Sequence, residues 1–384
     1  MGLARTRRAV GVLATLGTLL MVAAPAAHAD AARDKQWPLQ AYSAASKIWP
    51  ITTGKGQVVA VIDTGFRTTH VDLVGQFLPG KDFAPKSYNE AANASHGTMM
   101  ASLIAGHGHG ADDSDGIMGL APGVKILPLV VDLQADVDGR EVSGAIRYAV
   151  SHGANVINMS FAGISSTLVE QSAVAYAEAH NVVLVAGSGN DGIEADNYPA
   201  SYAGVVDVSG VNQNGSVWSG SDYGSHIVLA APGSDVLGDD SGTDTQYELG
   251  NGTSGATAYV SAAAALVRAK FPNLTAGQVI NRLIKTADDP SAKPGQTTPD
   301  LHYGYGIARP ERALAEDIPA GPAQGPLAQA SDPLAPSPVP STALAVTAGD
   351  STSNGVLWVS ASATVVAACL VILGVVLLRR RQRA

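Results

Sequence analysis

Short apolar runs alternate along the central part of the chain with segments that carry the three-to-four-residue spacing of helices. Runs rich in Val, Ile and Leu are typical of strands buried on both faces of a parallel sheet. The expected strands are 58–62, 126–131, 155–159, 182–186 and 205–208, and the expected helices lie near 97–106, 141–151, 167–180 and 255–270. This alternation predicts an α/β fold with a doubly wound, mainly parallel sheet flanked by helices. In such folds the site lies at the carboxyl ends of the strands.

A different apolar pattern marks the beginning of the chain. Arg5, Arg7 and Arg8 precede an apolar run from residue 9 to 24, and small residues at Ala27 and Ala29 follow. Positive charge, apolar run and small-residue cleavage site are the parts of an export signal, so we expect residues 1–29 to be one. The residues after Arg8 fit the twin-arginine route poorly, and the general secretory route is the one we expect.

The end of the chain carries a longer uncharged stretch. Residues 356–378 contain no charged side chain and would extend about 35 Å as a helix, enough for a hydrocarbon core of about 30 Å. Four arginines lie in the tail 379–384, which by the positive-inside rule places the C-terminus in the cytoplasm. We therefore expect one C-terminal transmembrane helix; a buried core helix is the alternative.

These patterns divide the remainder into three segments. Residues 30–54 form a short N-terminal extension, and residues 55–316 form the α/β domain. Residues 317–355 hold seven prolines among Ala, Ser and Gly, a composition typical of an extended tether.

Charge and cysteine content narrow the function classes. The chain has 33 acidic and 24 basic residues, a net charge of −9, and seven of the basic ones lie in the two terminal segments. The acidic remainder argues against nucleic acid or anionic membrane surfaces as partners. The one cysteine, Cys369, lies in the expected membrane helix, so the domain has no disulfide although an exported protein could form one.

Three polar residues carry the candidate chemistry. Asp63 closes the apolar run VVAVIDTG, His96 opens SHGTMMASLIAG, and Ser254 opens NGTSGATAYVSAAAAL. Taken singly, a turn carboxylate, a structural imidazole and a helix-capping hydroxyl are the commoner interpretations. Together they follow one of the known chain orders of a Ser-His-Asp triad, for which subtilisin itself is the standard example. Histidine can take the serine proton near neutral pH, and a buried carboxylate orients the imidazole.

The three motifs resemble those of the subtilisin-like serine peptidases, over about residues 55–316. The resemblance implies a serine endopeptidase with Asp63, His96 and Ser254 as catalytic residues. It places Asn190, in VVLVAGSGNDG, in the oxyanion hole; a turn residue is the alternative. It also implies that an extended polypeptide substrate binds between pocket walls formed by two segments. These walls are Ser160, Phe161, Ala162, Gly163, Gly187, Ser188 and Gly189.

Three positions depart from the family pattern. Ala162 stands where glycine is usual and is expected to narrow the pocket mouth. Gly255 replaces a larger apolar residue directly after Ser254, and Ala258 replaces a proline. None of these changes touches the triad, so we expect an active enzyme that requires no cofactor.

The order of segments is similar to that of the mycosins, membrane-anchored subtilases associated with type VII secretion. This resemblance implies a single-pass protein of the cell membrane with its catalytic domain outside the cytoplasm and the secretion machinery as a partner. A structural role in a secretion complex, with catalysis secondary, is the alternative function. Mycosins commonly carry disulfides in the catalytic domain, and this chain departs from them there.

A structural calcium ion is a further implication of the subtilase resemblance. Residues 111–122 put three carboxylates within four positions, directly before a GLAP segment that the family shares. The resemblance makes Asp72 and Asp113 the side-chain ligands, because calcium prefers several carboxylate and carbonyl oxygens. A solvated acidic turn is the alternative.

Overall fold

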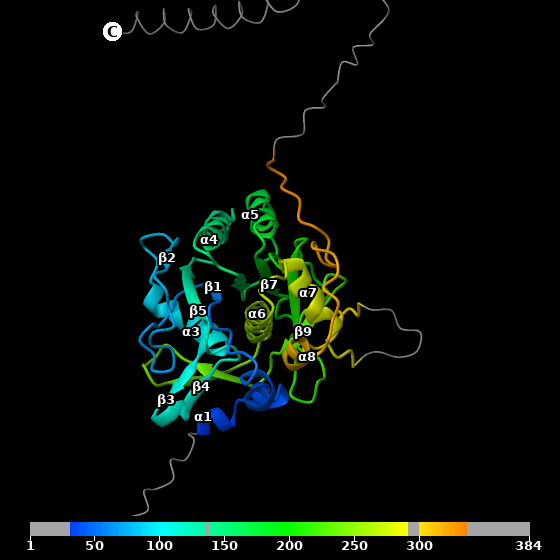
Figure 1. Ribbon diagram of the computed structural model, residues 1–384. Helices are drawn as coiled ribbons and strands as arrows, with labels where there is room; N and C mark the ends of the chain where they lie inside the picture. The colour runs from blue at the N-terminus through cyan, green and yellow to red at the C-terminus, as the bar shows by residue number, and fades with distance from the viewer. Residues whose placement is uncertain (1–30, 135–137, 291–298, 336–384) are drawn as a thin grey trace, which may run out of the picture. The chain divides into compact units, whose positions relative to one another are not determined.

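Seven parallel strands form the central sheet, in the order β2-β5-β1-β6-β7-β8-β9 (Figure 1). The computed structural model describes residues 31–134, 138–290 and 299–335. The strands of this sheet are β1 (Val58–Asp63), β2 (Lys81–Asp82), β5 (Lys125–Val130), β6 (Val156–Met159), β7 (Val183–Gly187), β8 (Val205–Val211) and β9 (Leu229–Pro232). Every neighbouring pair runs parallel. The mainly parallel α/β sheet predicted from the sequence is confirmed.

Strand β1 is the point where the strand order reverses. It pairs with β5 on one side, in register from Val58 with Lys125 to Asp63 with Val130, and with β6 on the other. In open α/β sheets such a reversal leaves a crevice at the carboxyl ends of the strands. Asp63 is the last residue of β1 and lies at this crevice.

Alternate side chains of β1 enter two separate cores. Val59 and Val61 belong to the core that also contains buried residues of α3 (Ala94–Ala105) and α6 (Thr253–Lys270). Ala60 and Ile62 belong to the core shared with α4 (Arg140–Ser151) and α5 (Leu168–Ala179). Helices therefore cover both faces of the sheet, which is why the strands are apolar at consecutive positions (Figure 1).

Helix α6 is buried along most of its length. Most of its alanines, among them Ala258 and Ala262, are buried and small enough to let the helix lie close to the sheet. The helix ends at Lys270, before Phe271-Pro272, as the restriction that proline places on the preceding residue predicts. All five expected strands and all four expected helices are present, with ends within three residues of the prediction.

Several short elements complete the described part. Two-stranded sheets are formed by β3 (His107–His109) with β4 (Asp115–Met118) and by β10 (Val236–Asp239) with β11 (Tyr247–Gly250). The remaining helices are α1 (Ala31–Asp34), α2 (Trp37–Ala41), α7 (Ala276–Lys285) and α8 (Pro310–Ala315). Single turns occur at η1 (Ala44–Ile48), η2 (Glu90–Asn93) and η3 (Ala111–Asp113).

The N-terminal extension packs on the domain. The indole of Trp37 is 8% exposed and donates to the carbonyl oxygen of Ser234 at 3.0 Å. Gln36 is buried and exchanges two hydrogen bonds with the backbone of Met118. Residues 31–54 are thus part of the packed structure.

Residues 317–335, at the start of the expected tether, also contact the domain. Gln278 and Asn281 on α7 donate to the carbonyl oxygens of Gly321 and Ala320. Farther along, Ala330 N–H donates to Glu178 on α5 at 2.7 Å. The segment for which we expected an extended tether therefore begins with residues bound to the domain, and its remainder, 336–355, lies outside the described ranges.

Within the described ranges, no helix combines the length and the apolar character needed to cross a membrane. The expected export signal (1–29), the expected membrane helix (356–378) and the basic tail (379–384) lie outside them.

Candidate active site

Asp63 and His96 form the first half of the site. Asp63 is fully buried at the end of β1, and His96 lies in the first turn of α3. Nδ1 of His96 is 2.9 Å from both carboxylate oxygens of Asp63, and Thr64 N–H donates to Oδ1 at 2.8 Å. A carboxylate accepts these bonds, so Nδ1 carries a proton and Nε2 is left as the basic nitrogen.

The surroundings of His96 move its pKa in opposite directions. Burial lowers the pKa, while the charge and the hydrogen bond of Asp63 raise it, and the charge of Glu248 adds to the increase. The net result is a pKa above the ordinary value of histidine. The imidazole is 41% exposed at its outer side, which leaves it accessible to substrate.

Ser254 lies in the first turn of α6. Its Oγ donates to the carbonyl oxygen of Ser160 at 3.0 Å, and Ser160 Oγ donates in return to the carbonyl oxygen of Ser254 at 3.0 Å. His96 lines the same cavity as Ser254, and rotation about the Cα–Cβ bond of Ser254 would free its proton from Ser160. Hydrogen bonds between catalytic groups often tighten in this way only when substrate binds.

The cavity that contains Ser254 offers two candidate hydrogen-bond donors. Asn190 follows β7, and its Oδ1 accepts from the N–H of Thr253 at 2.9 Å and from its hydroxyl at 3.2 Å. Because the oxygen of this amide is engaged, its NH₂ group is the part left to donate. The N–H of Ser254 belongs to the first turn of α6, where backbone N–H groups have no acceptor within the helix. This arrangement can stabilise an oxyanion.

The structure divides the predicted pocket walls into two groups. Ser160, Phe161 and Ala162 line a cavity of about 250 Å³ together with His96 and Ser254. Gly163 exchanges backbone hydrogen bonds with Tyr198 at 2.8 and 2.7 Å and lines an adjoining cavity of about 270 Å³.

The second predicted pocket wall, residues 187–189, is buried and not exposed in the cavity. Gly187, Ser188 and Gly189 are buried, and none of them lines the two described cavities that contain Ser254. Ser188 Oγ donates to the carbonyl oxygen of Asp222, and Gly189 N–H donates to Thr253 Oγ1. These residues support the turn that carries Asn190.

A further cavity, of about 200 Å³, also has Ser254 in its lining. Met99 and Met100 of α3 and Glu248 and Gly250 of β11 contribute to its lining, together with His96 and Asn190. These four residues were not predicted from the sequence as part of the site. Met99 and Met100 lie inside the histidine motif, but no motif marks Glu248, which belongs to a short strand.

The structure places the two expected calcium ligands in different surroundings. Asp72 is buried, and its carboxylate accepts from His109 Nδ1 and from Ile117 N–H, both at 2.7 Å. Asp113 lies in the exposed turn η3, and its carbonyl oxygen accepts from the Arg33 guanidinium at 2.5 Å. Arg33 also donates to the carbonyl oxygen of Asp115.

A cationic side chain of the extension therefore binds two carbonyl oxygens of this loop, which are groups of the kind that calcium prefers. Calcium binding at this loop stays a prediction, against which the position of Arg33 argues.

Comparison with known proteins agrees with this geometry. Residues 54–306 match the subtilase family. Fervidolysin of Fervidobacterium pennivorans is 31% identical over 315 residues, which cover 74% of this chain and 44% of that protein. Subtilisin DY of Bacillus licheniformis is 34% identical over 68% of this chain and 91% of its own length. The chain thus spans less than half of fervidolysin but most of subtilisin DY.

Solved structures give the same fold. MycP1 from the ESX-1 type VII secretion system is 29% identical and superposes with a TM-score of 0.63, covering 76% of this chain and 88% of MycP1.

Proposed function

The chain belongs to the subtilase family of serine peptidases, and on that premise we propose that it is an endopeptidase that cleaves exported polypeptides. The observation that carries the proposal is the pair Asp63–His96, joined at 2.9 Å, with His96 lining one cavity together with Ser254 and Asn190. Buried carboxylate, oriented imidazole, hydroxyl and amide donor are the groups that acyl transfer requires.

In the proposed reaction each group has one role. His96 Nε2 takes the proton of Ser254 Oγ as this oxygen attacks the scissile carbonyl carbon. The developing oxyanion accepts hydrogen bonds from the amide of Asn190 and from Ser254 N–H. His96 then passes its proton to the leaving amine, which breaks the peptide bond and leaves an acyl-enzyme. Water, deprotonated by His96, hydrolyses this ester and restores Ser254.

The two cavities at Ser254 bind different parts of the substrate. Ser160, Phe161 and Ala162 line the cavity for residues that precede the scissile bond, because the subtilase resemblance places the main specificity pocket at this segment. The other cavity that contains Ser254, with Glu248 in its wall, then receives the residues that follow the bond. An acidic wall favours a basic side chain at these positions.

The test is labelling of the purified chain with a fluorophosphonate probe, which reacts with an activated serine. The wild type should be labelled, and both Ser254→Ala and Asp63→Asn should lose labelling while keeping the wild-type melting temperature within a few degrees. Undiminished labelling of Ser254→Ala would show that another residue is the nucleophile.

We further propose that the chain is exported and anchored in the cell membrane by residues 356–378, with the catalytic domain outside the cytoplasm. The uncharged stretch and the arginines that follow it support this topology. The likeness to MycP1, a protein of a type VII secretion system, supports a link to such machinery. Protease added to intact protoplasts should remove the domain and leave a small membrane-bound fragment; a fully protected domain would reverse the topology.

Comparing Ser254→Ala cells with cells that lack the gene distinguishes a structural role in a secretion complex from a catalytic one. If secretion persists in Ser254→Ala cells and stops when the gene is deleted, the structural role is the essential one.

A further inference from the structure

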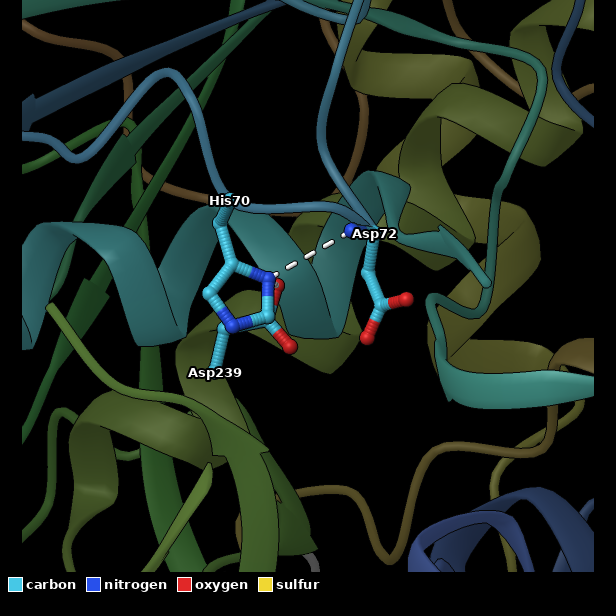
Figure 2. A group of neighbouring side chains, drawn as sticks. All are labelled: His70, Asp72 and Asp239. Carbon is cyan, nitrogen blue, oxygen red and sulfur yellow. Dashed lines mark hydrogen bonds and ion pairs between the residues drawn. The ribbon is translucent and has the colours of Figure 1, made fainter. Parts of the chain in front are cut away.

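Three buried side chains outside the active site converge on one point. His70 and Asp72 lie in the loop that follows β1, and Asp239 is the last residue of β10. All three side chains are fully buried. Figure 2 shows Asp239 approaching the imidazole of His70 from the side opposite to the loop. One ligand atom from each residue lies within 4.8 Å of the other two, and among the described residues these three form the group able to hold a metal ion.

The hydrogen bonds of His70 leave a lone pair directed at a carboxylate. Its Nε2 lies 3.1 Å from the carbonyl oxygen of Gln246, which can only accept, so Nε2 carries a proton. The N–H of Asp72 approaches the other ring nitrogen, Nδ1, at 3.4 Å, which agrees with a lone pair there (Figure 2). Nδ1 nevertheless lies 3.0 Å from Oδ2 of Asp239. A proton shared between Nδ1 and Oδ2, or a metal ion bound to both atoms, relieves the repulsion between their lone pairs at this distance.

Asp239 has few partners for a buried carboxylate. Apart from the contact of Oδ2 with His70 Nδ1, neither of its buried oxygens has a hydrogen-bond partner. Burying a carboxylate with so few partners is unfavourable, and the carboxylate of Asp72 lies close enough to interact with it. Asp72 is held in place by His109 and by Ile117 N–H, so it cannot turn away without losing both contacts.

We propose that His70, Asp72 and Asp239 bind one divalent transition-metal ion of the zinc type, as a structural site. A neutral imidazole with two carboxylates gives such an ion three suitable ligands and cancels its charge inside the protein. Ligand atoms around a tetrahedral zinc ion are about 3.4 Å apart, given bonds of about 2.1 Å, and the 3.0 Å between Nδ1 and Oδ2 is near this value.

The same donor set does not suit calcium, which takes six to eight oxygen ligands. The site thus differs from the expected calcium site, with which it shares only Asp72. His109 becomes an outer partner that orients the Asp72 carboxylate, as metal-bound carboxylates commonly require.

A metal ion at this site would connect two segments of the domain. It joins the loop after β1 to the end of β10, and β10 pairs with β11, the strand that carries Glu248 and Gly250 of the cavity beside Ser254. An ion at this point would hold the wall of that cavity against the sheet.

The experiment measures metal in the full chain carrying Ser254→Ala, which prevents self-digestion. After growth with zinc and removal of free metal, mass spectrometry should find about one zinc per chain. Cobalt(II) in place of zinc should give the visible absorption of a tetrahedral ion. Zinc at 100 times its dissociation constant should raise the melting temperature of the metal-free chain by roughly 4–8 °C.

Variants locate the site. Asp239→Asn, and the double variant Asp72→Asn with Asp239→Asn, should each lose the bound zinc and the temperature shift. The double variant also removes both buried charges, so it remains informative if the single one fails to fold. Asp112→Asn, an exposed carboxylate in η3, is the matched control and should keep both properties.

Absence of stoichiometric zinc, manganese or cobalt from the folded full chain, with no temperature shift, would overturn the proposal whatever the variants do. Equal zinc binding by the folded double variant would do so too.

Discussion

Ser254 and Ser160 are joined by two hydrogen bonds that run in opposite directions, each from the hydroxyl of one residue to the carbonyl oxygen of the other, and each 3.0 Å long. Ser160 directly follows β6, and Ser254 lies in the first turn of α6. The chain of bonds continues inward, because Asn158 Nδ2 donates to Ser160 Oγ and Ser261 Oγ donates to Asn158 Oδ1. The nucleophile is thereby fixed to the end of a central strand.

Replacing Ser160 with Ala should therefore weaken both folding and catalysis. The change removes the bond to the Ser254 carbonyl and leaves the buried amide of Asn158 without its acceptor, a loss of about 1–3 kcal/mol in the free energy of unfolding. Turnover should fall as the nucleophile loses a restraint, with KM less affected. Urea unfolding and steady-state kinetics measure the two effects. Ser46→Ala, at an exposed position, is the control; a Ser160→Ala protein as stable as this control would contradict the argument.

Hydrogen-bonded pairs such as Ser160 and Ser254 could not be predicted from the sequence, whereas the elements and motifs beside them could. The strand ending at Asp63 and helix α6 were predictable because their apolar runs are long and end in clear signals. Asp63, His96, Ser254 and Asn190 could be found because each belongs to a motif that stands beside such an element. The tie between Ser160 and Ser254 could not be found, since it joins residues 94 positions apart through backbone oxygens that every residue has.

Helix α7 and strand β11 were not predicted from the sequence, for different reasons. Helix α7 was missed although Thr275 and Gln278 form a capping box, whose sequence signature is a threonine followed three positions later by glutamine. Strand β11 had no such signal, because its four residues are partly or fully exposed and its alternation, Tyr-Glu-Leu, is too short to indicate a strand. Glu248 lies on β11, so the acidic wall of the second cavity could come only from the structure.

Asn190→Ala should lower turnover without unfolding the protein. Its amide is placed to donate to the oxyanion, and loss of one such donor costs about 10²–10³ in kcat, a magnitude measured in subtilisin itself. KM should change little, because the bond forms mainly in the transition state. Kinetics on a fluorogenic peptide measure this, with the exposed Asn214→Ala as control. Wild-type turnover in Asn190→Ala would remove Asn190 from the oxyanion hole.

The acid side of the pH–rate profile should depend on His96. Only the neutral imidazole can accept the serine proton, so activity falls as pH drops through the pKa of His96. Asp63 and Glu248 raise this pKa above the ordinary value, against the lowering effect of burial. Loss of activity should accordingly begin at a pH above that of an ordinary histidine.

Glu248→Gln tests whether the charge of Glu248 raises the pKa of His96. Without the negative charge the pKa of His96 decreases, so the acid limb of kcat/KM should move to lower pH. Because Glu248 is exposed, added salt should shrink the difference between wild type and variant. Glu194→Gln, also exposed, should leave the profile unchanged. A limb that moves to higher pH in Glu248→Gln would contradict the sign of this interaction.

Glu248 should also select substrates. It lines the cavity assigned to residues after the scissile bond, where a lysine or arginine side chain would meet its carboxylate. Exposed ion pairs are worth about 0.2–1 kcal/mol, so a basic residue there should raise kcat/KM by roughly up to fivefold over a neutral one. Glu248→Lys should reverse the order in favour of acidic residues. Profiling with a peptide library measures the preference, and an identical profile in both proteins would exclude Glu248 from the binding site.

The N-terminal extension should stabilise the domain and leave the active site open. Trp37 donates its indole N–H to the carbonyl oxygens of Ser234 and Asp235, at 3.0 and 3.1 Å, and is 8% exposed. Trp37→Ala should cost about 3–5 kcal/mol in the free energy of unfolding, by analogy with other buried aromatic side chains.

Trp37→Phe keeps most of the packing and loses the hydrogen bonds, so it should cost only about 0.5–1.5 kcal/mol. Neither change should raise kcat/KM in the folded protein, because no residue of the extension lines the two described cavities that contain Ser254. Chemical unfolding and peptide hydrolysis on the same samples give both readouts. If Trp37→Ala were as stable as the wild type and more active, the extension would act as an inhibitor of the site.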